Sequence, residues 1–363
     1  MIHTMISIIL GTRPEIIKMS PIIRECQKRN ITFNIIHSGQ HYSKNMDSVF
    51  FEQLELPAPD YNIHVGSGTQ AEQTGNALIG IERILLEKRP DIVLVQGDTN
   101  TVLAGAIAAS KLNIKIGHVE AGLRSYFREM PEEINRVLTD HCSDYLFAPT
   151  EKSRNILLKE GISDKNIFVT GNTVVDAVYQ NLELSKKKIS ILKDYNLKKS
   201  GYILATVHRK ENVDNPVIFR NILNSFLRIS NEFNIPVIYP IHPRAKKMME
   251  MLDCNLSGII FTEPLDYLSF LQLEQNAKII LTDSGGLQEE ACIMKVPCVT
   301  LRDNTERPET VDVGANILSG TLSESIFKSV EKMMSIKAEW INPFGDGSSS
   351  KKILDILNKD QLL

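Results

Sequence analysis

Short runs rich in valine and isoleucine alternate with longer stretches of helical periodicity along nearly the whole chain, and this alternation restricts the possible folds more than any other feature. In the first half, the runs lie at residues 6–10, 32–37, 91–96, 115–119, 144–148 and 166–170. Strands that are separated by helices pair in parallel, and parallel sheets are covered by helices on both faces. The first half therefore predicts a doubly wound α/β domain.

A second series of runs follows a lysine-rich stretch at residues 186–199, which we interpret as a solvated surface or a linker. Its runs lie at residues 202–207, 236–240, 258–261, 277–281 and 297–301. The length of 363 residues also favours two domains. We expect the first domain at residues 1–171 and the second at 172–346, followed by a short amphipathic helix within residues 347–363.

Charge and cysteine content limit the partners and the compartment. A formal net charge of -3 leaves no general basic field, so we expect neither nucleic acid nor an anionic membrane surface as a partner. The five cysteines are scattered and form no CxxC pair, which favours reduced thiols and argues against a zinc site. The first apolar run is too short for a signal peptide, and no run has the length that a bilayer requires. We therefore expect a cytoplasmic protein.

Nearly every expected strand ends in a polar or glycine-containing turn, and ligands of open α/β sheets bind at such ends. The turn TDSGGLQEE at residues 282–290 has the outline of a phosphate site. Gly285 and Gly286 let backbone N–H groups approach an anion, the following helix adds its positive end, and Glu290 can accept hydrogen bonds from a ribose. Taken alone, the segment fits an ordinary strand-to-helix turn equally well. Two domains that faced each other through these ends would form one cleft.

The turn GTRPE at residues 11–15 follows the first strand and places Arg13 at the mouth of a helix, where its planar fork can clamp phosphate. The alternative is a solvated Arg13 beside a surface pair of Glu15 and Lys18. A G-x-G-x-x-A pattern at residues 66–71 resembles a dinucleotide fingerprint, but it lacks a good preceding strand and a later acidic residue. We interpret it as a polar loop that opens a helix over residues 70–87.

Three carboxylates stand where a reacting sugar can meet them. Asp98 and Glu120 follow neighbouring expected strands, and Glu132 begins the next helix. Each of them also has a structural interpretation, in which Asp98 caps a loop and Glu132 pairs with Arg136 one turn along the helix. Three acids at sheet ends nevertheless favour proton-transfer chemistry.

His208 ends the first strand of the second domain and precedes Arg209 and Lys210, which makes the turn cationic. His208 fits a phosphate-binding or proton-donating role as well as it fits simple hydrogen bonding. Phe270 precedes the phosphate-like turn on a helix and can stack on a base, although core packing is its default role. The histidines His118 and His242 are explained by local hydrogen bonds.

Together these segments form an ordered series that resembles the non-hydrolysing UDP-N-acetylglucosamine 2-epimerases over nearly the whole chain. The matching motifs are GTRPE at 11–15, GDT at 97–99, GHVEAGLR at 117–124, PEE at 131–133, TGNT at 170–173, TDSGGLQEE at 282–290 and TERPE at 305–309. No single motif is decisive, but the series is highly specific.

The resemblance implies two Rossmann-like domains in the GT-B arrangement, a last helix that packs on the first domain, and a homodimer. It implies reversible conversion of UDP-N-acetylglucosamine to UDP-N-acetylmannosamine with no cofactor, neither NAD nor metal. It makes Asp98, Glu120 and Glu132 the catalytic acids, and His208 joins them as a candidate. It places the following residues around the nucleotide sugar: Arg13, Lys18, His208, Phe270, Ser284, Gly285, Gly286, Glu290 and Arg307.

Members of this family from bacteria bind a second UDP-N-acetylglucosamine as an activator, partly through a glutamine-histidine turn. Gln40 and His41 remain here as possible allosteric residues, but Tyr42 and Ser43 replace the usual pair that follows. The sequence therefore makes allosteric activation doubtful. Three other functions also fit it: a hydrolysing 2-epimerase, a GT-B glycosyltransferase that uses a UDP-sugar, and a noncatalytic nucleotide-sugar sensor.

Overall fold

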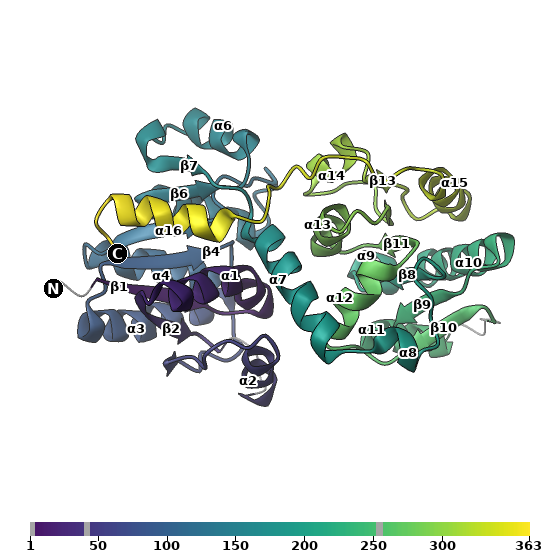
Figure 1. Ribbon diagram of the computed structural model, residues 1–363, viewed down its shortest axis with the longest axis horizontal. Coiled ribbons are helices and arrows are strands. Elements are labelled where there is room, and N and C mark those ends of the chain that lie inside the picture. Colours follow the sequence, from purple (N-terminus) through teal and green to yellow (C-terminus); the bar gives the residue numbers. More distant parts are fainter. Residues whose placement is uncertain (1–3, 40–43, 252–256) are drawn as a thin grey trace. The chain divides into compact units, whose positions relative to one another are not determined.

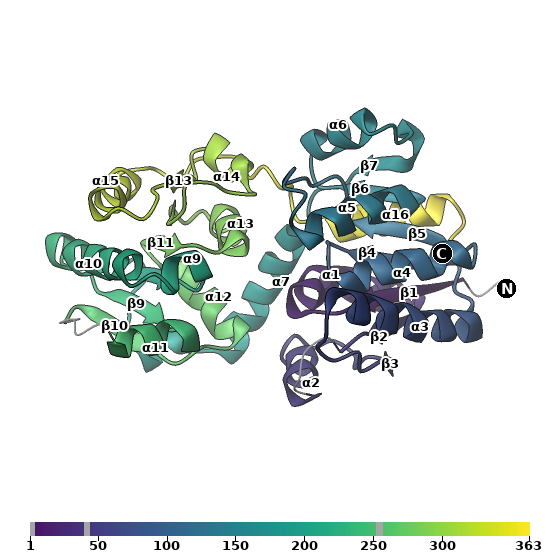
Figure 2. The ribbon, with the colours of Figure 1, turned by 180° about the vertical axis from the view of Figure 1, so that it is seen from behind.

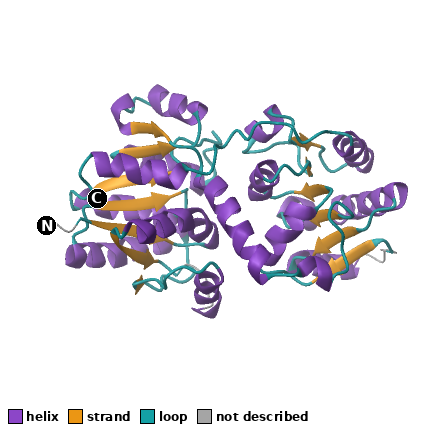
Figure 3. Cartoon of the chain, viewed as in Figure 1, coloured by secondary structure: helices purple, strands orange, loops and turns teal. Residues whose placement is uncertain are grey.

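The computed structural model describes residues 4–39, 44–251 and 257–363, and the chain forms two compact units (Figures 1 and 3). Unit 1 comprises Met1–Gln180 and Phe344–Leu363, and unit 2 comprises Asn181–Pro343. The junction falls inside helix α7 (Thr173–Lys188), later than the expected boundary after residue 171. Within the described residues, no helix combines the length and the apolar character of a membrane-spanning segment.

Unit 1 is built on a parallel seven-stranded sheet with the order β3-β2-β1-β4-β5-β6-β7. Its strands are β1 (Met5–Leu10), β2 (Thr32–His37), β3 (Tyr61–Asn62), β4 (Ile92–Gln96), β5 (Lys115–Val119), β6 (Tyr145–Ala148) and β7 (Ile167–Val169). The central strands are buried along almost their whole length, as strands covered on both faces must be.

Helices cover both faces of this sheet. They are α1 (Arg13–Arg29), α2 (Lys44–Gln53), α3 (Gln70–Lys88), α4 (Asn100–Lys111), α5 (Pro131–Cys142), α6 (Glu151–Lys159), a 3₁₀ turn (Asp164–Asn166), α7 and α16 (Ser349–Lys359). Figure 2 shows α3, α4 and α5 side by side on one face. Helix α4 approaches the sheet closely at Gly105, where an added Cβ would lie 2.9 Å from Ile9. Thr69 begins α3 with a full capping box, so the polar-loop interpretation of residues 66–71 agrees with the structure.

The last helix packs within unit 1, beside α1 (Figure 1). Buried Asp176 of α7 accepts hydrogen bonds from the backbone N–H groups of Ser349 and Ser350 at 3.1 and 2.9 Å. A carboxylate at the N-terminus of a helix accepts from the free N–H groups there and interacts favourably with the helix dipole. Arg29 and Asp355 add an ion pair of 2.6 Å between α1 and α16.

Unit 2 contains a parallel six-stranded sheet with the order β10-β9-β8-β11-β12-β13. Its strands are β8 (Ile203–Thr206), β9 (Val237–Pro240), β10 (Ile259–Thr262), β11 (Ile279–Thr282), β12 (Cys298–Thr300) and β13 (Asn316–Leu318). Its helices are α8 (Ile191–Asp194), α9 (Lys210–Val213), α10 (Pro216–Phe233), α11 (Pro243–Met251), α12 (Tyr267–Asn276), α13 (Gly285–Ile293), α14 (Pro308–Asp312) and α15 (Ser323–Met334). Separate apolar clusters fill the two faces of this sheet.

The predicted fold class of two doubly wound α/β domains is therefore confirmed. In each sheet the strand order reverses at one point, between β1 and β4 in unit 1 and between β8 and β11 in unit 2. Open α/β sheets bind ligands at the carboxyl ends of the strands that flank such a point. The turns after these four strands thus define where a site is expected in each unit.

Candidate active site

The switch point of unit 1 places Arg13 after β1 and Asp98 after β4. Thr12 holds the N-cap position of α1, and the half-buried Arg13 begins the helix. Glu15 is buried and accepts hydrogen bonds from the Gly11 N–H at 2.5 Å and the Thr12 hydroxyl at 3.0 Å. Burial raises the pKa of Glu15 to about 7. Glu15 therefore shapes the turn, and the expected surface pair of Glu15 and Lys18 is wrong.

Lys18 instead pairs with Glu120 at the end of β5. Its Nζ lies 2.8 Å from Oε1 and 2.6 Å from Oε2 of Glu120, and Gln96 Nε2 donates to Oε2 at 2.5 Å. Glu120 is only 6% exposed and has a φ of 71°, in the left-handed region that favours glycine. A non-glycine residue held there costs about 1–3 kcal/mol, a strain that occurs mainly at functional sites.

Asp98 is held by Arg136 of α5. The Nε and Nη2 atoms of Arg136 lie 2.9 and 2.6 Å from Asp98 Oδ2, and Asn135 donates to the Asp98 carbonyl at 2.9 Å. The expected pair of Glu132 and Arg136 is wrong, because Arg136 reaches Asp98 and Glu133 instead. Glu132 is exposed at the start of α5.

The neighbouring acid, Glu133, shapes the loop before α5. It accepts hydrogen bonds from both the N–H and the hydroxyl of Ser125 and from the Tyr126 N–H, each at 2.9 Å, and pairs with Arg136 at 2.7 Å. Burial opposes ionisation, but these donors outweigh it and lower the pKa of Glu133. The sequence did not indicate the role of Gln96, because only its contact with Glu120 on the neighbouring strand distinguishes it from other buried strand residues.

In unit 2 the switch point brings His208 and Asp283 together. Asp283 is fully buried and lies 2.9 Å from His208 Nδ1, while the backbone N–H groups of His208 and Arg209 donate to it at 3.1 and 3.0 Å. Asn212 adds a fourth donor at 3.1 Å. Burial opposes ionisation, but the contact with His208 and the other donors lower the pKa of Asp283. His208 is 46% exposed, so its far ring edge remains accessible.

The predicted phosphate turn opens helix α13 as expected. Ser284 is its N-cap, with no side-chain capping bond, and the first helical residues are Gly285 and Gly286. A Cβ added at Gly286 would meet nothing within 4 Å, and one at Gly285 would come no closer than 3.6 Å to Glu306. The backbone of this first turn is therefore open to an anion.

Charged side chains of the following loop lie close to this turn. Arg307 Nε lies 2.9 Å from Glu289, and Arg302 forms two hydrogen bonds of 2.9 and 2.8 Å with Glu306. These bonds lower the pKa of Glu306 to about 2. Arg209 lies 3.6 Å from the Glu306 carboxylate. Ion pairs with Glu289 and Glu306 therefore fix the orientation of the three arginines near the first turn of α13.

Glu290 lies on the second turn of α13 and accepts a hydrogen bond of 3.2 Å from the Tyr267 hydroxyl. Phe270 packs against the apolar cluster that includes Tyr202 and Leu273, which is the default role expected for it. Its stacking on a base stays a prediction. Gln40 and His41 lie outside the described residues.

Glu274 of α12 is a fully buried carboxyl group with no hydrogen-bond partner for either oxygen among the described residues. Burial and the nearby Glu290 raise its pKa well above the ordinary value. We expect Glu274→Met to raise the free energy of unfolding by about 1–3 kcal/mol, because it removes an unpaired buried polar group. Thermal unfolding at pH 5 and pH 8 measures the gain.

The gain should be larger at pH 8. The pKa of Glu274 is higher in the folded than in the unfolded protein. As the pH rises above the unfolded pKa, the unfolded state releases its proton first, so the wild type loses stability that the Met variant keeps. Glu274→Gln is the matched control, since it removes only the ionisation and should abolish the pH-dependent part. A Glu274→Met protein that is less stable than the wild type at both pH values would contradict this account.

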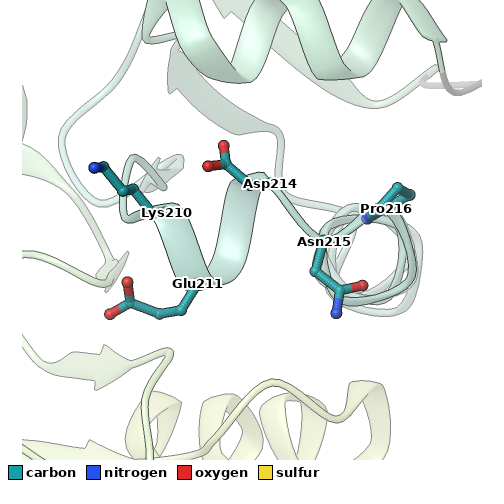
Figure 4. A pocket seen from close by; sticks show the side chains of 5 residues that line it. All are labelled: Lys210, Glu211, Asp214, Asn215 and Pro216. Atoms are coloured by element: carbon teal, nitrogen blue, oxygen red, sulfur yellow. The ribbon is translucent and has the colours of Figure 1, made fainter.

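An open pocket of about 590 Å³ lies beside α9 in unit 2 and is lined by Lys210, Glu211, Asp214, Asn215 and Pro216. Figure 4 shows the carboxylates of Glu211 and Asp214 pointing in different directions. With two acids and one lysine, this pocket does not suit a diphosphate. It contains none of the predicted substrate-binding residues.

In the part of the chain that the structure describes, no cluster of three or more histidine, cysteine or acidic residues is placed to hold a metal ion.

The comparisons with known proteins agree with this geometry. The family model described as UDP-N-acetylglucosamine 2-epimerase matches residues 24–358. A UDP-N-acetylglucosamine 2-epimerase of Methanocaldococcus jannaschii is 58% identical over 97% of this chain and 98% of its own. A crystal structure of the epimerase from that organism, in complex with UDP-GlcNAc and UDP, is 57% identical with a TM-score of 0.87 over 98% of this chain and 100% of that one.

A third relative has a different substrate in its name. It is the UDP-2,3-diacetamido-2,3-dideoxy-D-glucuronate 2-epimerase of Pseudomonas aeruginosa, 40% identical over 97% of this chain and 98% of its own.

Together, the fold and these relatives define a two-domain α/β enzyme of the nucleotide-sugar class. More specifically, the chain belongs to the UDP-N-acetylglucosamine 2-epimerase family, and the resemblance found in the sequence is confirmed.

Proposed function

We propose that the protein interconverts UDP-N-acetylglucosamine and UDP-N-acetylmannosamine by eliminating and re-adding UDP, without hydrolysis. The observation that carries this proposal is Glu120, a buried acid in strained backbone with Lys18 and Gln96 as donors. Asp98 follows the adjacent strand and is oriented by Arg136. Two oriented acids at neighbouring strand ends provide the proton-transfer groups that inversion at a sugar carbon needs.

The chemistry explains why elimination is required. The C2 hydrogen of the pyranose has no adjacent carbonyl that would stabilise a carbanion, so simple proton exchange at C2 is inaccessible. In the proposed route a base removes the C2 proton while the bond between C1 and the UDP oxygen breaks, which gives 2-acetamidoglucal and UDP. A proton is then delivered to the opposite face of C2, and a β-phosphate oxygen of UDP adds back to C1. Atoms and charge therefore balance without an oxidant.

The departing diphosphate needs donors that are already in place. We assign this role to Arg13, Ser284, Gly285, Gly286 and Arg307, with His208 as a phosphate ligand or proton donor. Uracil and ribose binding are assigned to Phe270 and Glu290. The nearly buried Glu290 carboxylate supports the second of these roles, because a carboxylate accepts from ribose hydroxyls. Lys18 orients Glu120, and Glu132 is the third candidate acid.

The substrate assignment rests on the degree of similarity. The Methanocaldococcus jannaschii relative named for UDP-N-acetylglucosamine is 58% identical, and the relative named for a diacetamido-glucuronate is 40% identical. Both names describe epimerisation at C2, so the reaction is shared and the sugar substituents differ. We therefore propose UDP-N-acetylglucosamine as the substrate.

An NMR time course in deuterated buffer tests the function. We expect UDP-N-acetylglucosamine to gain deuterium at C2 and to yield the manno epimer with UDP still attached, in the absence of NAD, metal or a sugar acceptor. Free N-acetylmannosamine with stoichiometric UDP would indicate a hydrolysing enzyme instead. Turnover only with an acceptor and without C2 exchange would indicate a glycosyltransferase.

We also propose a homodimer that forms through the face of α3, α4 and α5 shown in Figure 2. Large apolar side chains on this face are 45–52% exposed: Ile79 and Leu86 on α3, and Ile134 and Leu138 on α5. An exposed apolar patch of this kind commonly marks a protein interface.

The four described cysteines are free, which fits the reducing cytoplasm that we propose for this enzyme.

The dimer is tested by introducing charge on α5. The double variant Ile134→Glu, Leu138→Glu should weaken self-association by at least about 100-fold, since two carboxylates would be buried without partners in the interface. Sedimentation equilibrium measures the effect. Leu322→Glu in unit 2, at a side chain that is 68% exposed, is the control and should remain a dimer. A double variant that dimerises like the wild type would exclude this face.

A further inference from the structure

His118 lies on β5, two residues before Glu120, and is almost fully buried. Both of its ring nitrogens have a partner. Nε2 lies 2.9 Å from the Gly97 carbonyl oxygen, and Nδ1 lies 2.6 Å from Asp140 Oδ1. The imidazole thus bridges the turn after β4 and helix α5, the two elements that hold Asp98.

The two partners fix both edges of the ring. A carbonyl oxygen only accepts, so Nε2 must donate to Gly97. Asp140 is fully buried, and its Oδ2 lies 2.7 Å from Arg124 Nη1 and 3.2 Å from the Gly122 N–H. These donors fix the Asp140 side chain, and Asp140 in turn fixes the Nδ1 edge of the His118 ring.

Charged neighbours hold this arrangement in place. Arg124 is itself held by the partly exposed Glu160 through bonds of 2.9 and 2.6 Å. His141 lies 3.9 Å from Glu160, and its side chain is 45% exposed.

The Nε2 contact acts on the backbone that carries Asp98. Gly97 has a φ of 85°, and its N–H bonds to the Val119 carbonyl at 3.2 Å, so this turn departs from regular strand geometry. Arg136, one helical turn before Asp140 on α5, holds the Asp98 side chain, and the His118 ring holds the preceding carbonyl. Helix α5 therefore holds both the side chain of Asp98, through Arg136, and the carbonyl before it, through Asp140 and His118.

We infer that His118 is a positioning residue that fixes the Gly97 carbonyl and thereby the placement of Asp98 against the sugar. This inference rests on the proposed catalytic function of Asp98. It assigns to the His118 ring two separate contacts, one that serves stability through Asp140 and one that serves turnover through Gly97.

Two amide variants separate these contacts. The amide of His118→Asn reaches the position of Nδ1 and keeps the Asp140 contact, whereas the amide of His118→Gln reaches the position of Nε2 and keeps the Gly97 contact. We expect His118→Asn to lower kcat by about 10- to 100-fold with little change in KM, because small displacements of a catalytic group have effects of this order. His118→Gln should retain kcat within about fivefold but melt at the lower temperature of the two.

A purely structural role predicts that kcat follows stability, so a His118→Gln enzyme that is both the less stable and the less active would overturn the inference. The wild type is run beside the variants in the deuterium exchange experiment. No exchange in the wild type would refute the proposed function itself, whereas wild-type exchange with equal kcat for the two variants would refute only the positioning role.

A spectrum of the wild type tests the Gly97 contact directly and needs no variant. With ¹⁵N-labelled histidine, His118 should show a protonated Nε2, because the Gly97 carbonyl can only accept. The exposed His64 serves as the internal reference for a histidine in solvent. A His118 signal with an unprotonated Nε2 would contradict the inference.

Discussion

Replacing Glu120 by glutamine is expected to lower kcat by at least about 100-fold and to leave the affinity for UDP within about threefold. The amide keeps the shape of the side chain but removes the carboxylate that Lys18 and Gln96 contact at 2.5–2.8 Å. UDP affinity should survive, because the groups proposed to bind the diphosphate lie mainly in unit 2. Steady-state kinetics and calorimetric titration with UDP measure the two quantities.

Glu151→Gln is the matched control for this experiment. Its side chain is 70% exposed on α6, and its contact among the described residues is a 3.5 Å ion pair with Arg154, so turnover should not change. A melting temperature close to that of the wild type would show that Glu120→Gln still folds. Wild-type turnover by Glu120→Gln would remove Glu120 from the mechanism.

Asp283→Ala is expected to destabilise the protein by about 3 kcal/mol or more, because it leaves several donors around a buried position without an acceptor. The backbone N–H groups of His208 and Arg209 and the Asn212 amide all donate to Asp283. The variant should also lower the affinity for UDP, since the His208 ring loses the contact that orients it. Denaturant unfolding and UDP titration measure these effects.

The loss of stability should depend on pH in a defined direction. The pKa of Asp283 is lowered in the folded state, so its contribution is present above the unfolded pKa and is lost as the pH falls through the folded value. The difference between wild type and variant should therefore be constant near neutrality and shrink in acid. Asp214→Ala is the control, because its side chain is 55% exposed and lies 3.6 Å from Arg244. Equal effects of the two substitutions would contradict the role of Asp283.

Most of the fold could be predicted from the sequence, because buried parallel strands leave contiguous apolar runs. Every run predicted in the two series corresponds to a strand. The two strands that were missed, β3 (Tyr61–Asn62) and β13 (Asn316–Leu318), are short edge strands whose few residues carry no period. Each of them pairs only with the strand that precedes it in the chain, β3 with β2 and β13 with β12.

The positions of the site residues followed from the same pattern, but their partners did not. Arg13, Asp98, His208 and Ser284 were expected at strand ends and lie at the two switch points. Local spacing suggested that Lys18 pairs with Glu15 and Arg136 with Glu132, and both pairings are wrong. Arg136 has a local partner, Glu133 on its own helix, but Glu120 and Asp98 follow other strands. A single sequence carries no information about such distant contacts.

The central claim is that the bond between C1 and UDP breaks and re-forms in every epimerisation. UDP-N-acetylglucosamine with ¹⁸O in the oxygen that bridges C1 and the β-phosphorus tests it, because released UDP can rotate its terminal phosphate before it adds back. ³¹P NMR should show the label spreading to non-bridging positions of both epimers as they interconvert. Formation of the manno epimer with all of the label still in the bridge would contradict the account.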